Sequence, residues 1–201
     1  MNKTGIIILA AGNSSRLGRP KQLLLYQGKT LLSHVIDEAQ AATLAPVVVI
    51  TGAHHKEIQD SLIGRPVEIV FNPSWETGMA SGIVAGVTKI LHIQRHLQSL
   101  IVAVCDQPHI SARLFQSLTE KQIESGKGLI ASFYSGIAGT PVLFDRYYFN
   151  DLLALTGDAG ARQLLKQYPE DVATVPFPKG KIDIDTEDDF QRLSAQDGLI
   201  L

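Results

Sequence analysis

The chain has 201 residues, 45% of them hydrophobic, with a formal net charge of −2 and a pI near 6.3. This length is enough for one well-buried core and short for two, so we expect a single domain over residues 1–201. The near-neutral charge argues against a nucleic-acid partner and against a membrane surface, because both need clustered Lys and Arg. The first apolar run is too short to span a membrane and lacks a signal-peptide cleavage pattern, which predicts a cytoplasmic protein.

Buried strands alternate with helical patterns along the chain, beginning with the apolar run Ile6–Leu9. Such alternation implies parallel pairing with right-handed crossovers. Two later apolar runs flank a short Gly-rich connection, which predicts a hairpin and therefore an antiparallel strand. We expect a Rossmann-like α/β fold with a mainly parallel sheet and helices on both faces. The predicted strands are 6–9, 46–50, 67–71, 100–105, 128–133, the run that ends at 144, and 172–175; the predicted helices are 30–42, 56–63, one through Val87 and Leu91, one after Ser111, 150–155, 159–168, and one after 186.

The stretch Ile6–Gln22 joins the first strand to a loop of small residues. At residues 10–12 (Ala-Ala-Gly) no side chain is larger than a methyl, so a flat ring or a phosphate can approach the backbone N–H groups. Arg16 and Lys21 add positive charge; the alternative is a tight turn with two solvated basic residues. Five residues separate the glycine of this run from Gly18, whereas a Walker loop needs four, and the dinucleotide spacing G-x-G-x-x-G is also absent.

Asp106 directly follows the predicted strand 100–105. In open α/β sheets ligands bind at the carboxyl ends of strands, so Asp106 and the first loop should open on the same crevice. The alternative is a turn former or a helix cap. Ser111 is the better cap for the next helix, which leaves Asp106 without an obvious structural task. Cys105, the single cysteine, permits no intrachain disulfide, and we assign it a packing role.

Two further acids, Asp183 and Asp185, alternate with isoleucines near the C-terminal end of the chain. In an extended segment both acids face one side and the isoleucines face the core. The two like charges repel unless a cation lies between them or water solvates them. The acids that follow Thr186 suit the first turn of a helix capped by that threonine. The six histidines do not make a metal site, since their one pair at helical spacing lacks the Glu of a zincin.

Five segments form a series of motifs in chain order: L-A-A-G-x-S-x-R-L-G-x-P-K at 9–21, N-P-x-W-x-x-G-M-x-S at 72–81, C-D-Q-P at 105–108, G-D-x-G-A-R at 157–162 and D-I-D-T-x-x-D at 183–189. Together they resemble the MobA-like nucleotidyltransferases, and most of all the molybdenum cofactor cytidylyltransferases of the MocA group. The resemblance implies the fold of the nucleotide-diphospho-sugar transferases. Three positions depart from the family pattern: Leu17 replaces a Met, Gly82 replaces a second Ser, and Thr140 replaces a His.

The resemblance implies a role for each segment. The first loop wraps a nucleoside triphosphate, and Asp106 binds Mg²⁺, with Asp183 or Asp185 completing the metal site. Arg162 holds the anionic acceptor, because a guanidinium can take a phosphate by two parallel hydrogen bonds. We interpret Asp158 as a helix cap. The implied nucleotide-binding residues are Leu9, Ala10, Ala11, Gly12, Arg16, Lys21, Ser81 and Asp106, of which Arg16, Lys21 and Asp106 are the catalytic ones.

The implied reaction is the transfer of CMP from CTP to the phosphate of molybdenum-molybdopterin, with release of pyrophosphate. The recipient of the product would be a molybdenum hydroxylase or its maturation chaperone. The preference for CTP rests on Ala11, because the guanylyl-transferring relatives read L-A-G-G at this loop. A Cβ at this position narrows the space beside the backbone and should hinder a purine more than a pyrimidine.

Two other functions stay open at this point. A nucleotidyltransferase that uses GTP, or that acts on a sugar phosphate or an alcohol phosphate, would share the loop and the aspartates; the G-D-x-G-A-R segment argues against the sugar and alcohol phosphates. A non-catalytic relative would bind the cofactor and pass it on. The presence of Arg16, Lys21 and Asp106 together argues against that second alternative.

Overall fold

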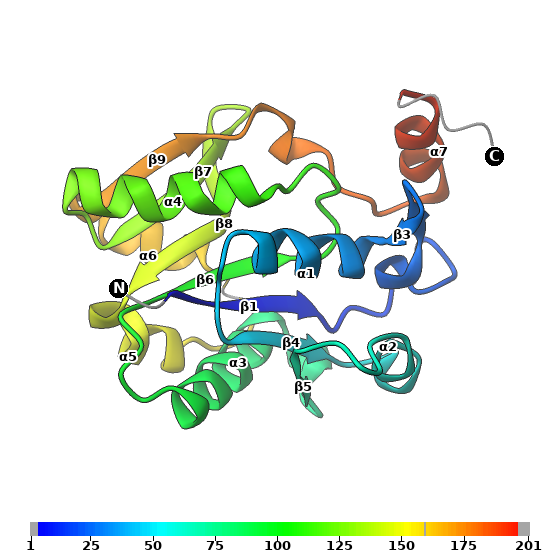
Figure 1. Ribbon diagram of the computed structural model, residues 1–201, viewed down its shortest axis with the longest axis horizontal. Helices are drawn as coiled ribbons and strands as arrows, with labels where there is room; N and C mark the ends of the chain where they lie inside the picture. Colours follow the sequence, from blue (N-terminus) through cyan, green and yellow to red (C-terminus); the bar gives the residue numbers. More distant parts are fainter. Residues whose placement is uncertain (1–3, 159, 197–201) are drawn as a thin grey trace.

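A computed structural model describes residues 4–158 and 160–196 and shows an α/β fold built on a seven-stranded sheet (Figure 1). The strands of this sheet are β1 (Thr4–Ala10), β4 (Val47–Thr51), β5 (Glu68–Phe71), β6 (Ser99–Val104), β7 (Leu129–Tyr134), β8 (Ile137–Asp145) and β9 (Val172–Pro176). The helices are α1 (Leu31–Ala41), α2 (His55–Ser61), α3 (Met79–Ile93), α4 (Ala112–Ser125), α5 (Phe149–Leu153), α6 (Arg162–Gln167) and α7 (Glu187–Gln196).

The sheet has the strand order β5-β4-β1-β6-β8-β7-β9. β8 runs antiparallel to both of its neighbours, β6 and β7, and the other neighbouring strands of this sheet pair in parallel. The hairpin formed by β7 and β8 therefore inserts one reversed strand into a parallel sheet. The predicted mainly parallel Rossmann-like fold, with its antiparallel hairpin, is confirmed.

Helices cover both faces of the sheet, as the continuous apolar runs of the strands require. On one face α1, α2 and α4 pack through residues such as Ile36, Ile58 and Phe115. On the other face α3, α5 and α6 pack through residues such as Val87 and Leu164. Along β1, Ile6 and Ile8 belong to the first core and Ile7 to the second, so successive side chains of one strand serve opposite layers.

A third, smaller core joins the two ends of the described chain. It contains Leu17 from the first loop, Leu31 at the start of α1, and Ile184, Phe190 and Leu193 from the C-terminal part. In Figure 1, α7 lies beside β3 (Lys29–Thr30), which pairs with β2 (Leu25–Tyr26) in a two-stranded hairpin. This packing brings the predicted acidic segment against the first loop.

Local sequence signals set several element boundaries. The Thr30 side chain caps α1 by accepting a hydrogen bond from the Ser33 N–H, and the Ser111 side chain does the same for α4. Thr186 and Asp189 bond reciprocally at the start of α7, with the Asp189 carboxylate accepting from the Thr186 N–H. These three helix starts follow the sequence predictions.

The structure adds one element and corrects one expectation. The hairpin of β2 and β3 is absent from the predictions, and it turns at Gln27 and Gly28, whose φ angles are +50° and +78°. Asp158 does not cap a helix, since α6 begins only at Arg162 and has no side-chain cap. The predicted start of this helix at Ala159 lies outside the described residues. Residues 182–185 lie outside helices and strands, and Ile184 is buried as the alternation predicts.

No helix within the described ranges is long and apolar enough to cross a membrane.

Candidate functional site

The site lies where β1 and β6 end side by side. The two strands are parallel neighbours, and Leu9 pairs in register with Val104, so the loop after β1 and Asp106 after β6 emerge at the same edge of the sheet. Backbone bonds extend this arrangement to a third segment, because the Ile184 N–H donates to the Asp106 carbonyl at 3.1 Å. The prediction that Asp106 and the first loop open at the same edge of the sheet is therefore correct.

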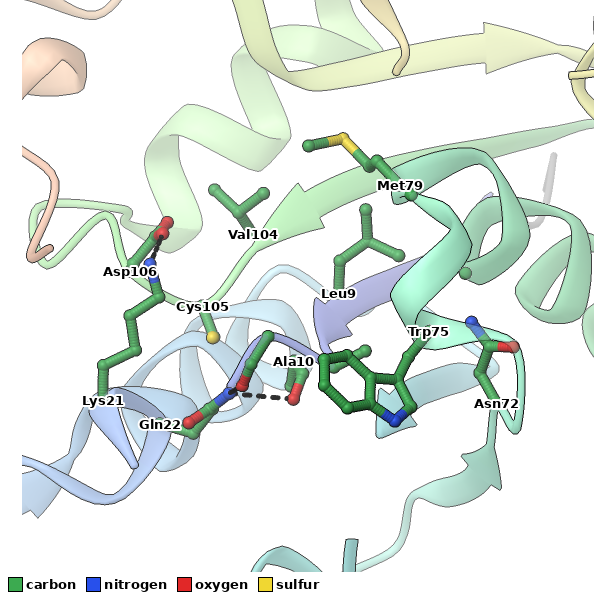
Figure 2. Close-up of a pocket in the computed structure, with 14 residues that line it drawn as sticks. Leu9, Ala10, Lys21, Gln22, Asn72, Trp75, Met79, Val104, Cys105 and Asp106 are labelled. Atoms are coloured by element: carbon green, nitrogen blue, oxygen red, sulfur yellow. Dashed lines mark hydrogen bonds and ion pairs between the residues drawn. The ribbon is translucent and has the colours of Figure 1, made fainter. Parts of the chain in front are cut away.

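A first cavity of about 250 Å³ opens between these strand ends. Figure 2 shows Lys21 and Asp106 joined at one side of it and the indole of Trp75 at the other. Gly52 permits the close approach of Trp75 to the loop, since a Cβ there would lie 2.7 Å from the indole Cγ. The lining residues are Leu9, Ala10, Ala11, Gly12, Lys21, Gln22, Asn72, Trp75, Gly78, Met79, Gly82, Val104, Cys105 and Asp106.

The turn that carries Trp75 is fixed by Asn72 and Ser81. Buried Asn72 accepts a hydrogen bond from the Ser74 N–H and donates to the Ser81 Oγ at 2.8 Å. The Ser81 hydroxyl is also within hydrogen-bond distance of the Ser74 and Gly78 carbonyls. Ser81 was predicted to bind nucleotide, but its side chain bonds within this turn and it is not among the residues that line the first cavity.

Lys21 links two of the predicted acidic residues, Asp106 and Asp185. Its Nζ donates to Asp106 Oδ2 at 2.6 Å and to Asp185 Oδ1 at 2.9 Å. Arg16 Nη2 donates to the other oxygen of Asp185 at 2.7 Å. The Lys21 side chain is only 16% exposed, whereas that of Arg16 is 69% exposed and lies outside the cavity lining. The structure thus brings Arg16, Lys21, Asp106 and Asp185 into one network.

The charges of this network shift several pKa values. Burial disfavours the charged Lys21 ammonium, but attraction and hydrogen bonds from Asp106 and Asp185 outweigh it and raise the Lys21 pKa. The hydrogen bond from Lys21 is the main cause that lowers the pKa of Asp185. Partial loss of water, with repulsion from Asp106 and Asp185, raises the pKa of Asp183. Asp183 therefore takes up a proton more readily than Asp185.

The predicted metal ligands do not form a preorganised metal site. Asp106 and Asp183 both line a second cavity, and Asp185 reaches Asp106 through Lys21. In the part of the chain that the structure describes, no group of three or more His, Cys, Asp and Glu residues is arranged to hold a metal ion. An ammonium group already lies between two of the three carboxylates.

This second cavity, of about 520 Å³, adjoins the first and shares Met79, Val104 and Asp106 with it. Arg162 lines it, and its role in binding the acceptor stays a prediction. A backbone bond from the Ala80 N–H to the Gly157 carbonyl, 3.1 Å long, holds the segment before α6 against the start of α3. The remaining lining residues are Gln107, Tyr134, Ser135, Ile137, Thr140, Asp158, Gly160, Ala161, Gly180, Lys181 and Asp183.

Several lining residues escaped the sequence reasoning. Gln22 and Gln107 are polar residues that are 1% and 4% exposed, and each donates through Nε2 to a backbone carbonyl. Lys181 lies in a short 3₁₀ turn after β9 and lines the second cavity. No spacing rule marks these residues. Gln107 belongs to the C-D-Q-P segment and Gln22 ends the Ile6–Gln22 stretch, but the sequence assigns neither of them a role.

Comparison with known proteins identifies the family. The model of the MobA-like NTP transferase domain matches residues 6–172. Nicotine blue oxidoreductase of Paenarthrobacter nicotinovorans is 31% identical over 199 residues, which cover 93% of this chain and 94% of that protein. A probable molybdenum cofactor guanylyltransferase of Bacillus cereus (strain AH187) is 36% identical over 122 residues, 60% of this chain and 58% of that protein.

A solved structure agrees with this relationship. The crystal structure of the Mycobacterium tuberculosis Rv0371c homologue from Mycobacterium sp. strain JC1 superposes with a TM-score of 0.82, at 27% identity, over 96% of both chains. The family match spans the first loop, Asp106 and Arg162, and so includes most of the residues that line the two adjoining cavities; Gly180, Lys181 and Asp183 of the second cavity lie beyond it. The chain therefore belongs to the MobA-like NTP transferase family and is a nucleotidyltransferase.

Proposed function

We propose that the protein transfers CMP from CTP to the phosphate of molybdenum-molybdopterin and releases pyrophosphate. The observation that carries this proposal is the position of Asp106 on the wall shared by two adjoining cavities. The first cavity is lined by the small-residue loop that would receive the nucleotide. The second is lined by Arg162, which suits an acceptor that bears a phosphate.

In this reaction a phosphate oxygen of the acceptor attacks the α-phosphorus of CTP. A new P–O bond forms, the bond between the α-phosphorus and the bridging oxygen breaks, and pyrophosphate leaves with that oxygen. No covalent enzyme intermediate is required. The work of the protein is to position two anions and to neutralise charge, because phosphoryl transfer gains most from positioning and electrostatic stabilisation.

Lys21 and Arg16 supply the positive charge in this proposal. In the structure both cations pair with Asp185, and Lys21 also pairs with Asp106. A triphosphate that enters the first cavity offers each cation a stronger anion, so the pairs would be exchanged for phosphate contacts. The predicted role of Asp106, Asp183 and Asp185 as Mg²⁺ ligands stays a prediction, since Lys21 lies between two of these carboxylates.

CTP is proposed over GTP because of Ala11. Ala11 lines the first cavity, where its methyl group, absent from a glycine, would leave less room for a two-ring base. The runner-up is guanylyl transfer, and it is supported by the name of the Bacillus cereus relative. That match covers 58% of the relative, whereas the nicotine blue oxidoreductase match covers 94% of its relative.

The deciding experiment is a product assay with purified protein and molybdopterin that carries molybdenum. CTP, GTP and ATP are supplied separately and in competition, with Mg²⁺ and with EDTA, and both pyrophosphate and the dinucleotide product are measured. We expect cytidylylated cofactor, formed only in the presence of the divalent ion. Guanylylated cofactor as the main product would favour the runner-up, and cofactor binding without pyrophosphate release would favour a non-catalytic carrier.

The name of the full-length relative calls for a control. The same preparation is incubated with nicotine blue and a reduced nicotinamide, and the dye absorbance is followed. We expect no turnover of the dye. Dye reduction in a preparation that releases no pyrophosphate from any nucleoside triphosphate would overturn the proposed reaction.

The proposed recipient of the product is a molybdenum hydroxylase or its maturation chaperone. This part of the proposal follows from the family resemblance alone. Co-purification of the product-loaded protein with such an enzyme tests it separately from the chemistry.

A further inference from the structure

Gln22 is a buried polar residue that holds the first loop from behind. Its side chain is 1% exposed, and its Nε2 donates to the Ala10 carbonyl at 3.0 Å and to the Gly12 carbonyl at 2.9 Å. Figure 2 shows both bonds as dashed lines beside the first cavity. These two carbonyls flank Ala11, so one amide group fixes the backbone on both sides of it.

Other groups hold the neighbouring carbonyls of the same loop. The Ala53 N–H donates to the Ala11 carbonyl at 3.2 Å, and His54 Nε2 lies 3.1 Å from the Asn13 carbonyl. Four successive carbonyls, from residue 10 to residue 13, therefore have partners in the protein. In a planar trans peptide the N–H points away from the carbonyl, so the N–H groups of residues 11–13 face away from those partners.

Burying the side-chain amide of Gln22 lowers the stability of the fold, which indicates that this residue has a role other than packing. The two carbonyls can accept only from Nε2, so the orientation of the amide is fixed. Its Oε1 is then buried, and it has no hydrogen-bond partner among the described residues. An unsatisfied buried acceptor lowers stability, and an apolar side chain of similar size would avoid that cost. What an apolar side chain could not supply is the pair of hydrogen bonds from Nε2 to the carbonyls of Ala10 and Gly12.

We infer that Gln22 is a positioning residue that sets the nucleobase selectivity of the first cavity. By fixing the carbonyls on either side of Ala11, it fixes how far the Ala11 methyl projects beside the bound base. This inference rests on the proposed function, because it assumes that a nucleobase occupies the first cavity. It assigns selectivity to a residue whose side chain is 1% exposed and which acts by holding the loop.

The test is a binding titration read by Trp75, which is the only tryptophan of the chain and lines the first cavity. Its fluorescence reports the Kd of CTP and of GTP without turnover. Gln22→Met removes the donor, and Gln22→Glu keeps the shape but replaces the donor with an acceptor. We expect the ratio of the two Kd values to fall toward one by about tenfold in both variants, whichever nucleotide the wild type prefers.

A matched control is Gln122→Met, because Gln122 is half-buried on α4 and its Nε2 donates to Asp145 at 3.2 Å, at the other end of the sheet. We expect it to keep the wild-type ratio even where it lowers the melting temperature. If the Met and Glu variants do not fold, Gln22→Asn keeps a shorter donor that can reach only one carbonyl, and it should lower the ratio partially.

The outcomes separate the inference from the proposed function. A folded Gln22→Met or Gln22→Glu protein that keeps the wild-type Kd ratio within twofold overturns the inference alone. Wild-type protein that binds no nucleoside triphosphate overturns the proposed function. A fall in the ratio in both Gln22 variants, with the ratio of Gln122→Met unchanged, supports the role of Gln22.

Discussion

The two cavities on either side of Asp106 are built differently. One wall of the first is the continuous run Leu9–Gly12, and a residue only ten to twelve positions away holds two of its carbonyls. The second is lined by side chains from separate segments, among them the charged groups of Asp158, Arg162, Lys181 and Asp183. A loop of small residues discriminates between ligands by their shape, whereas charged side chains discriminate by the charge of the ligand. Substitutions in the first cavity should therefore change which nucleotide is used, and substitutions in the second should change how the acceptor is held.

Asp106 belongs to both cavities, so its loss should have the largest effect. We expect Asp106→Ala to reduce pyrophosphate release by about a thousandfold. The fold should survive, because the side chain is 19% exposed and bonds to Lys21 and not to the core. Turnover and the melting temperature are measured together. Near-normal turnover in a variant that melts like the wild type would contradict the role of Asp106.

Substitutions of Lys21 and Arg16 test whether the protein binds the phosphates of a nucleoside triphosphate independently of its base. Replacing either with Ala should weaken transfer from every nucleoside triphosphate by a similar factor, because phosphate contacts carry no base information. We expect about a hundredfold for Lys21 and about tenfold or less for Arg16, whose pair with Asp185 is exposed. The measurement is kcat/KM for CTP and for GTP. Unequal losses for the two nucleotides would show that the residue contacts the base and not the phosphates.

Arg162 tests whether the second cavity binds the acceptor. Arg162→Ala should raise the KM for molybdopterin by roughly tenfold to a hundredfold, since a hydrogen bond to a charged group contributes about 1.5–3 kcal/mol. The Kd of CTP, read by Trp75 fluorescence, should stay the same. A loss of CTP affinity as large as the loss for the acceptor would show that the two cavities do not divide the substrates.

Ala11 gives a smaller effect on selectivity. A difference of one methyl is typically worth about 1–3 kcal/mol, so we expect wild-type protein to prefer CTP by about tenfold to a hundredfold. Ala11→Gly should reduce this preference by improving the use of GTP, without reversing it. Competition between the two nucleotides measures the ratio. Equal use of CTP and GTP by wild-type protein would remove the cytidylyl part of the proposal.

Cys105 should have the smallest effect, although it lines the first cavity. Burial raises the pKa of its thiol to about 12, so the reactive thiolate is scarce at neutral pH. We expect a thiol reagent to leave the folded protein unmodified at pH 8 and to react after unfolding. Cys105→Ala should keep the nucleotide affinity. Rapid modification of the native protein would show that the cavity wall opens.

The sequence predicted the parts of the site that depend on short-range patterns. The apolar run of β1, the small residues of the loop and the position of Asp106 after β6 all follow from neighbouring residues. The caps at Thr30, Ser111 and Thr186 do so as well, because a helix cap joins groups about three residues apart. Asp158 shows the limit of this reasoning, since a suitable cap residue occurs there without a helix start.

The tertiary structure decided how these parts meet. Lys21 bonds to Asp106 and Asp185, which lie 85 and 164 residues further along the chain, and no local pattern encodes such pairs. The small core around Ile184 and Phe190 brings Asp185 to the first loop, so apolar packing sets an ionic contact. The sequence by itself determined the strands, the loop and the family of this protein, because these depend on local periodicity and motifs. Only the packing of distant segments decided that an ammonium lies between two of the three predicted metal ligands, because burial and charge pairing act across the whole fold.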